Sequence, residues 1–391
     1  MNLIPTPSSR VLYLDGLRGI ASFVVVVSHF IAGFFPPLYF GAEGKESFET
    51  LDAIANSPLF VLYSGTFSVF IFFVLSGFVI SASAIKSKNN VFVLIIARYF
   101  RLTIPVVSSL LMAFLLLLVF AGIPQQAGSI VNHWWLAFMY QPPIPSLSVV
   151  FKEGLFNVYW SGISYFNNVL WTMRIELLGS VSIYIIYLIA KTKIRVGLLV
   201  LITLGLCFGV RQWPNSLCSF FLGALIYECW AKGWFVSNNR MGVLLILVGL
   251  FLGGLPFQPS QGTIYSIIFD YVNILTPAFN TVRIAGAACL LVGIFLCPVV
   301  RVFLEAAIPR FLGRISFAIY LVHFPLLCFI GSFCYIHFGR YSVVNMLVLI
   351  GFYFFAVLAV SYGFTVFIDE PTLRCISYLK RRIKQHGVRP I

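Results

Sequence analysis

The chain has 391 residues, of which 60% are hydrophobic and only 10% are charged. A soluble domain carries about 25% charged residues, and several apolar runs here exceed the ~18 residues that cross a bilayer. The composition therefore excludes a soluble globular protein and predicts an all-α, polytopic membrane bundle. The net charge of +14 could indicate nucleic-acid binding, but the positions of the basic residues argue against that function.

Apolar segments predict about ten transmembrane helices in a single domain, 1–391, with its core at about 10–374. The first run begins near Val11 and ends in Phe34-Phe35-Pro36-Pro37, without the small residues of a signal-peptide cleavage site. The expected spans cover residues 12–35, 63–84, 97–121, 168–190, 195–210, 215–231, 241–256, 282–299, 312–334 and 344–368.

Basic residues gather on one side of this predicted topology. With the N-terminus inside, twenty of the 26 Lys and Arg residues fall on the inner side. The outer loops hold only Lys45, Lys152, Arg211 and Arg340. This bias predicts that both termini are cytoplasmic. The basic tail, 375–391, is expected to lie on anionic membrane lipids, with no nucleic acid as partner.

Two longer connections are expected at the outer face. Residues 36–62 are acidic, with Glu43, Glu46, Glu49 and Asp52. Residues 122–167 are rich in aromatic residues and proline, and a short interfacial or re-entrant helix is expected near 131–140.

The eight cysteines include no CxxC pair. They are expected to be small buried residues rather than disulfides or metal ligands. No metal site is predicted.

The first span carries three ionisable residues, Asp15, Arg18 and His29. On a helix, Arg18 and His29 differ by only ~20° around the axis and lie ~16 Å apart along it, and Asp15 lies within ~40° of His29. Ionisable groups inside a bilayer are costly and usually mark a functional path. His29 is a candidate general base. The alternative is a neutral core histidine bonded to a neighbouring helix, with Asp15 and Arg18 as an ordinary interfacial pair.

Two further motifs follow along the chain. Ser76-Gly77 interrupts a Phe-rich helix, where glycine allows close backbone approach or a kink. Arg98 and Arg101 stand three residues apart at the inner end of the third span, so their guanidinium groups share a face that suits phosphate. The alternative for these arginines is that they only set the topology.

Carboxylates and a second histidine occupy later spans. Glu176 lies about one turn inside the outer end of the fourth span, and Thr172 shares its face. Arg174 lies about 200° away around the helix, so Glu176 needs a partner elsewhere or protonation. His323, two residues before Pro325, is expected to be structural.

Together these segments resemble the membrane-bound acyltransferase 3 family. The family's first-span motif is a basic residue followed, after ten residues, by a histidine, and Arg18 and His29 match it. Its Asp-Gly-Leu-Arg-Gly context matches residues 15–19. Its Ser-Gly, Arg-x-x-Arg and Trp-Ser/Thr-x-x-x-Glu motifs match Ser76-Gly77, Arg98 with Arg101, and Trp171-Thr172 with Glu176. Its Ile-Ser-Tyr-x-Leu-Tyr-Leu-x-His-x-Pro motif resembles 315–325, with Phe317 for tyrosine. At its closing Glu-x-Pro, Asp369 stands where the family has glutamate.

The resemblance implies transfer of an acyl group, often acetyl, from cytosolic acyl-CoA to a hydroxyl. Arg18, Arg98 and Arg101 would hold the donor phosphates, and the pantetheine arm would pass Ser76-Gly77. His29 would deprotonate the acceptor or carry the acyl group transiently. Asp15 would orient Arg18, and Glu176 would orient His29 or the acceptor. The outer aromatic residues would stack on sugars or form an aromatic belt; they are Trp134, Trp135, Tyr140, Tyr159, Trp160 and Trp171.

We therefore expect an O-acyltransferase, with acyl-CoA as substrate and no permanently bound cofactor. Its acceptor would be a surface polysaccharide or its lipid-linked precursor at a bacterial inner membrane. One alternative is an acyltransferase acting on a small molecule or lipid. The other is a transporter of an anionic solute. Hydrolysis of acyl-CoA by the purified protein would exclude the transporter.

Overall fold

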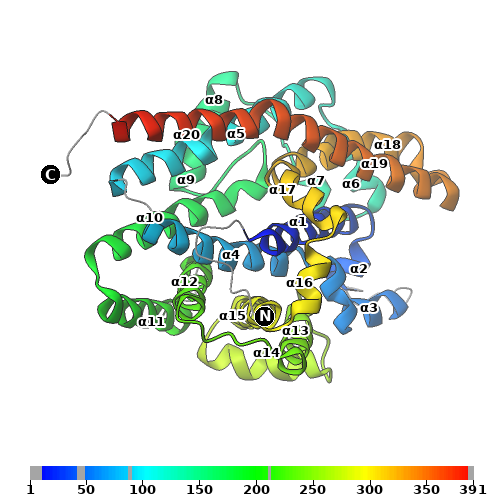
Figure 1. The fold of residues 1–391 in the computed structure, drawn as a ribbon. Helices are drawn as coiled ribbons and strands as arrows, with labels where there is room; N and C mark the ends of the chain where they lie inside the picture. Colours follow the sequence, from blue (N-terminus) through cyan, green and yellow to red (C-terminus); the bar gives the residue numbers. More distant parts are fainter. Residues whose placement is uncertain (1–10, 42–48, 87–89, 210–212, 386–391) are drawn as a thin grey trace. The chain divides into compact units, whose positions relative to one another are not determined.

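The computed structural model describes residues 11–41, 49–86, 90–209 and 213–385, and this part of the chain is all-α (Figure 1). Several residues used for the topology prediction lie outside these ranges, so the structure does not bear on them: Arg10, Glu43, Lys45, Glu46, Lys88, Arg211 and Arg389.

Seven helical segments in the described residues are long and apolar enough to cross a membrane. They confirm a polytopic helical bundle. The segments are Leu12–Phe34 (α1), Gly65–Lys86 (α4), Val91–Val119 (α5), Asn168–Ile189 (mostly α10, Trp171–Ile189), Ala278–Leu296 (α15), Ala307–His337 (α17, Ala307–Leu326, to α18, Ser332–His337) and Val343–Ile383 (α19, Val343–Phe364, into α20, Glu370–Gln385).

The remaining three expected spans correspond to α11 (Thr192–Gly209), α12 (Cys218–Ala231) and α13 (Asn239–Gly253). Of these, α12 and α13 are shorter than predicted, with 14 and 15 residues. The 14 residues of α12 reach only ~21 Å, less than the ~30 Å of a hydrocarbon core. The sequence analysis also missed an apolar helix, α14 (Ile264–Leu275), in a region expected to be an outer loop.

Shorter elements connect these helices. They are α2 (Pro36–Phe40), α3 (Glu49–Ala55), η2 (Pro58–Tyr63), α6 (Ile123–Val131), α7 (Trp134–Ala137), α8 (Leu147–Lys152), the π-helical turns η3 (Glu153–Asn157), η6 (Leu327–Gly331) and η8 (Thr365–Asp369), α9 (Val158–Trp160), η4 (Asn168–Leu170), η5 (Trp213–Leu217), α16 (Pro298–Leu304) and η7 (Gly339–Tyr341).

The chain forms two compact units, each assembled from separate stretches. The first unit comprises the described parts of 1–25, 40–95 and 178–314, and the second those of 26–39, 96–177 and 315–391. The predicted site residues divide between them. Asp15, Arg18, Ser76 and Gly77 belong to the first unit, and the others belong to the second.

In the first unit, α4 packs against α12 through glycine. A Cβ on Gly77 would overlap the carbonyl of Phe220, and one on Gly223 would overlap the carbonyl of Val74. Such backbone contact lets helices approach closely without relying on long side chains. The Ser76-Gly77 interruption therefore serves helix packing, and its role in donor binding stays a prediction.

Hydrogen bonds to a buried carboxylate and a disulfide also connect helices within the first unit. The buried Glu228 carboxylate on α12 accepts from Arg195 Nε on α11 at 2.8 Å and from Tyr187 Oη on α10 at 2.7 Å. A disulfide joins Cys207 on α11 to Cys218 at the start of α12, with their Cα atoms 6.0 Å apart. The expectation that the cysteines form no disulfide is therefore wrong for this pair, because the turn between the helices brings the two residues together.

In the second unit, part of the connection 122–167 lies beside α5 instead of beyond its end. Tyr99 Oη donates to the carbonyl of Leu155 at 2.7 Å, and Thr103 Oγ1 donates to Tyr159 Oη at 2.9 Å. The segment that folds back along a transmembrane helix is thus 147–160. At 131–140, where a short interfacial or re-entrant helix was expected, the structure has the four-residue helix α7.

Candidate active site

Two histidines from different helices meet in the second unit. His29 lies on α1 and is partly buried, whereas His323 on α17 is fully buried. Nε2 of His323 lies 3.1 Å from Nδ1 of His29, within hydrogen-bond distance. His323, expected to be structural, is therefore in direct contact with the predicted base.

The second ring nitrogen of His323 fixes the direction of this hydrogen bond. Nδ1 lies 2.9 Å from the carbonyl of Ile319, which can only accept, so Nδ1 carries a proton. In a neutral His323, Nε2 then has only a lone pair to offer. His29 must donate through Nδ1, which leaves its own lone pair on Nε2. A neutral imidazole with an unprotonated Nε2 is the form that acts as a general base.

Aromatic rings frame His29. The ring of Trp135 on α7 stacks on it at a centroid distance of 5.8 Å and an angle of 25°. Phe324, next to His323 on α17, meets it edge-on at 5.5 Å and 80°. Of the predicted acceptor-binding tryptophans, Trp135 thus lies against the base. Trp134 and Trp171 are 51% and 38% exposed, and their role in acceptor binding stays a prediction.

A pocket of about 300 Å³ adjoins this arrangement through Phe324. Its lining residues are Phe138, Met139, Tyr140, Gln141, Ser164, Tyr165, Asn168 and Phe324. The sequence prediction included only Tyr140 among them. The volume is at the lower end of the range for small-molecule sites.

Hydrogen bonds hold the polar rim of this pocket. The buried Glu153 carboxylate, in the π-helical turn η3, accepts from Ser164 Oγ at 2.7 Å and from the backbone N–H of Tyr165 at 3.0 Å. Burial and the charge of Glu153 raise the pKa of Tyr165. Tyr140 has a left-handed backbone with φ +54°, and its Oη donates to the carbonyl of Phe166 at 2.9 Å. Strained positions of this kind concentrate at functional sites.

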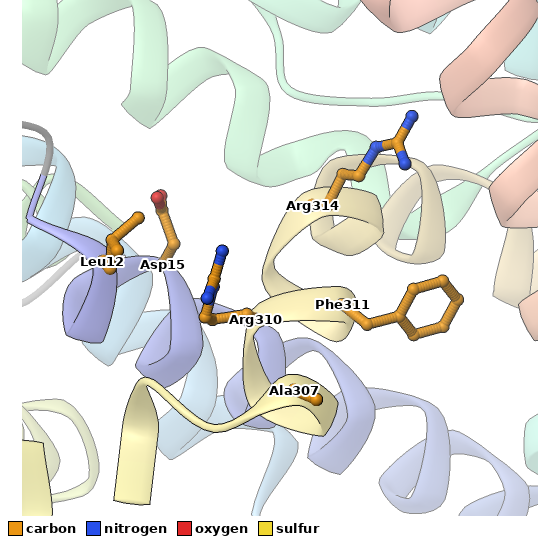
Figure 2. Close-up of a pocket in the computed structure, with 6 residues that line it drawn as sticks. All are labelled: Leu12, Asp15, Ala307, Arg310, Phe311 and Arg314. Atoms are coloured by element: carbon orange, nitrogen blue, oxygen red, sulfur yellow. The ribbon is translucent and has the colours of Figure 1, made fainter. Parts of the chain in front are cut away.

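In the first unit, Asp15 lines a second pocket, of about 470 Å³, together with Arg310 and Arg314 of α17 (Figure 2). The backbones of α1 and α17 touch here, because a Cβ on Gly313 would overlap the carbonyl of Asp15. This contact accounts for Gly19, which follows Arg18, whereas Gly16, which follows Asp15, lies against the carbonyl of Leu304 on α16. Arg18 is half-buried on the same helix, and its predicted role at the donor phosphates stays a prediction.

The two arginines of the Arg-x-x-Arg motif hold carboxylates. Arg98 forms an ion pair with Glu176, so the partner that Glu176 required is an arginine of another helix. The prediction placed these two residues near opposite faces, and the ion pair shows that α5 and α10 bring them to the same depth. Arg174 instead donates to the carbonyl of Ser161 at 3.2 Å.

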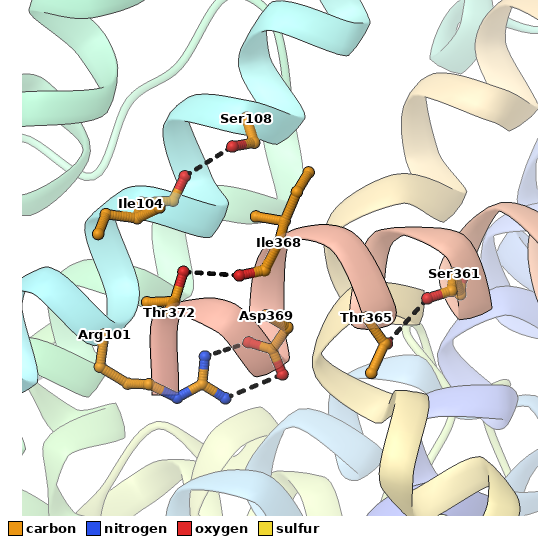
Figure 3. Close-up of polar contacts among 8 residues, drawn as sticks. All are labelled: Arg101, Ile104, Ser108, Ser361, Thr365, Ile368, Asp369 and Thr372. Carbon is orange, nitrogen blue, oxygen red and sulfur yellow. Dashed lines mark hydrogen bonds and ion pairs between the residues drawn. The ribbon is translucent and has the colours of Figure 1, made fainter. Parts of the chain in front are cut away.

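Arg101 forms the second ion pair, with both oxygens of Asp369 (Figure 3). Asp369 is 5% exposed and lies in the π-helical turn η8. Nearby hydroxyls bond within their own helices, for example Thr372 Oγ1 to the carbonyl of Ile368 at 2.6 Å. Asp369, whose role was open, therefore anchors Arg101. Phosphate binding by Arg98 and Arg101 stays a prediction.

Three contributors to this arrangement were not predicted from the sequence. His323 was discounted because a lone histidine before proline is usually structural. Phe324 gave no signal, since the chain has 41 phenylalanines. Glu153 was overlooked, although a carboxylate inside an aromatic-rich segment was a usable clue. In the described residues, no group of three or more His, Cys, Asp or Glu side chains could hold a metal ion.

Comparisons with known proteins agree with the resemblance found in the motifs. Residues 11–366 match the model of a family described as an acyltransferase domain, acyltransferase 3. Acyltransferase R4 of Phoma sp. is 22% identical, and the similarity covers 97% of each chain. Acyltransferase clz18 of Cochliobolus lunatus is 24% identical, over 96% of this chain and 97% of the relative.

A third relative is the O-acetyltransferase PaAT-1 of Phomopsis amygdali, 25% identical over 82% of this chain and 72% of the relative. No solved structure matches the chain. Because the family match extends over most of the sequence, the chain belongs to the acyltransferase 3 family and is a membrane-embedded acyltransferase.

Proposed function

We propose that the chain is an O-acyltransferase that moves an acyl group from acyl-CoA to a hydroxyl of a small molecule. The hydrogen bond between His29 and His323 carries this proposal, because it places the proton of His29 on Nδ1 and leaves Nε2 unprotonated, as a base requires. Acetyl is the first acyl group to test, since one relative is named an O-acetyltransferase.

The chemistry needs one proton acceptor and one leaving group. Nε2 of His29 takes the proton of the acceptor hydroxyl as its oxygen attacks the thioester carbonyl. The new C–O bond forms, the C–S bond breaks, and the released thiolate of CoA takes the proton back from His29. General-base catalysis of this kind contributes ~10²–10⁴-fold to the rate.

The pocket beside Phe324 supports a small acceptor over a polysaccharide. Its volume of about 300 Å³ suits one compact molecule, and its aromatic lining suits a partly apolar one. The relatives named above are fungal, which gives no support to a bacterial surface polysaccharide. We also propose that acyl-CoA reaches the protein from the cytoplasmic side, with both termini there, as the distribution of basic residues favours.

The test is acyl transfer by the purified full-length chain. Acetyl-CoA is mixed with a panel of small hydroxyl compounds, and acceptor-dependent release of CoA is followed together with the product mass. His29→Ala should lower the rate by ~10²-fold or more, whereas His337→Ala, at an exposed histidine of the same unit, should not.

The competing outcomes are distinct. A His29→Ala variant that keeps more than about a tenth of the wild-type rate excludes the base role. Acyl-enzyme detected on His29 by mass spectrometry replaces direct transfer with a covalent intermediate. Transfer to isolated polysaccharide but to no small acceptor overturns the small-molecule proposal.

A further inference from the structure

The pocket in the first unit has a charged lining of its own. Arg310 and Arg314 lie four residues apart on α17, so their side chains share one face of that helix. Figure 2 shows both guanidinium groups and the Asp15 carboxylate extending to the same side of the two helices. Leu12 and Ala307 add an apolar wall.

The charge of this lining favours an anion. Two guanidinium groups face one carboxylate, so the pocket carries a net positive charge. Both arginines are exposed, and Arg310 lies in the first turn of the 20-residue helix α17, where the helix dipole adds to the positive potential. Planar guanidinium forks bind phosphate oxygens in pairs. The Asp15 carboxylate can accept from a hydroxyl or amino group attached to the same ligand.

The backbone contact between α1 and α17 fixes these groups relative to one another. A Cβ on Gly19 would overlap the backbone N–H of Gly313, and one on Gly313 would overlap the carbonyl of Asp15. Asp15 is therefore held against the turn of α17 that carries both arginines. The site is built from two helices in contact and does not depend on a loop.

We infer that this pocket binds the phosphate-bearing nucleotide part of the acyl donor. A nucleotide supplies what the lining selects: phosphates for the arginines, and ribose hydroxyls or a base amino group for Asp15. The volume of about 470 Å³ fits a group of this size. This assignment rests on the proposed function for the identity of the donor as acyl-CoA. A phospholipid headgroup offers the same phosphate chemistry from another source.

The experiment measures CoA binding to the full chain in phosphatidylcholine nanodiscs by isothermal titration calorimetry. Arg310→Ala and Arg314→Ala should each lower the affinity roughly 10- to 150-fold, as loss of one charge-assisted bond predicts. Arg314→Lys should recover part of this loss. Arg240→Ala is the matched control, because Arg240 is an exposed arginine on α13 outside the pocket. Pantetheine, which lacks phosphate, should bind all variants equally.

Three results would overturn the inference: no CoA binding by the wild-type chain, equal CoA affinity in the wild type and both alanine variants, or an equal loss in Arg240→Ala. The lipid source is tested in nanodiscs containing phosphatidylglycerol. If that lipid raises the unfolding temperature only when both arginines are present, while CoA affinity is unaltered by the variants, the pocket holds a headgroup. Acyl transfer by the wild type is measured separately. If the arginine variants lose CoA binding but the wild type transfers no acyl group, the binding site is supported and the proposed function is refuted.

Discussion

Nε2 of His323 accepts a hydrogen bond from Nδ1 of His29 over 3.1 Å, because the carbonyl of Ile319 holds the proton of His323 on its other ring nitrogen. The buried histidine thus selects the tautomer of the partly exposed one. Tyr353 adds a further support, since its Oη donates to the backbone carbonyl of His323 at 3.2 Å.

His323→Ala should lower kcat while the KM for acyl-CoA stays near its wild-type value. The variant removes the acceptor for His29 Nδ1–H, and an unsatisfied donor costs ~1–3 kcal/mol, or roughly 5- to 150-fold in rate. His323→Gln should restore part of the activity, because its side-chain oxygen can accept the same hydrogen bond.

Steady-state kinetics of the two variants, with the unfolding temperature measured in parallel, check this role. His323 acts as a positioning residue, so a stable His323→Ala protein with unchanged kcat would contradict it. A Gln variant as inactive as the Ala variant would instead indicate a packing role.

Asp369→Ala should destabilise the chain, because it leaves Arg101 without the carboxylate that now binds it through two oxygens. Breaking a buried pair costs ~3–5 kcal/mol, and the loss should fall toward the lower end because the Arg101 side chain is 22% exposed. Chemical denaturation in detergent measures the change.

Glu370→Ala is the control for that substitution. Glu370 lies 3.7 Å from Arg374, whose side chain is 80% exposed, and such surface pairs contribute ~0–1 kcal/mol. Equal losses of unfolding free energy in the two variants would show that the Arg101–Asp369 pair stabilises the chain no more than the surface pair does.

Gly77→Ala and Gly351→Ala should change stability in opposite directions. A Cβ at Gly77 would overlap the Phe220 carbonyl, so α4 and α12 must separate, at a cost of ~1–3 kcal/mol. A Cβ at Gly351, within α19, meets no heavy atom within 4 Å, so alanine there should stabilise the helix by ~0.5–1 kcal/mol. Thermal unfolding of the two purified variants tests this, and a stable Gly77→Ala protein would refute the packing argument.

The sequence predicted the long helices well, because twenty or more apolar residues in succession have few alternatives to a transmembrane helix. The prediction failed for short helices, because a short apolar segment can be either a helix or part of a loop. The 12 residues of α14 are apolar like a span, but they lie in a Pro- and Gly-flanked region that resembled a loop. The disulfide between Cys207 and Cys218 depends on the turn between two helices, which spacing alone did not show.

The candidate site was predictable only one residue at a time. His29 stood out because an ionisable group in an apolar span is costly. Glu176 was expected to need a partner elsewhere or protonation, and the structure shows a partner, Arg98. The identity of each partner could not be predicted, because Arg98 precedes Glu176 by 78 residues and His323 follows His29 by 294. Such pairings are set by how the helices pack, which periodicity along one helix does not encode.

The same separation in sequence has a consequence for biogenesis. Arg101 is synthesised 268 residues before Asp369, so the ribosome delivers the cation long before its counter-ion. A nascent or truncated chain that ends before η8 therefore holds Arg101 without that carboxylate. The charge of Arg101 on α5 is therefore paired with Asp369 only once synthesis has passed η8.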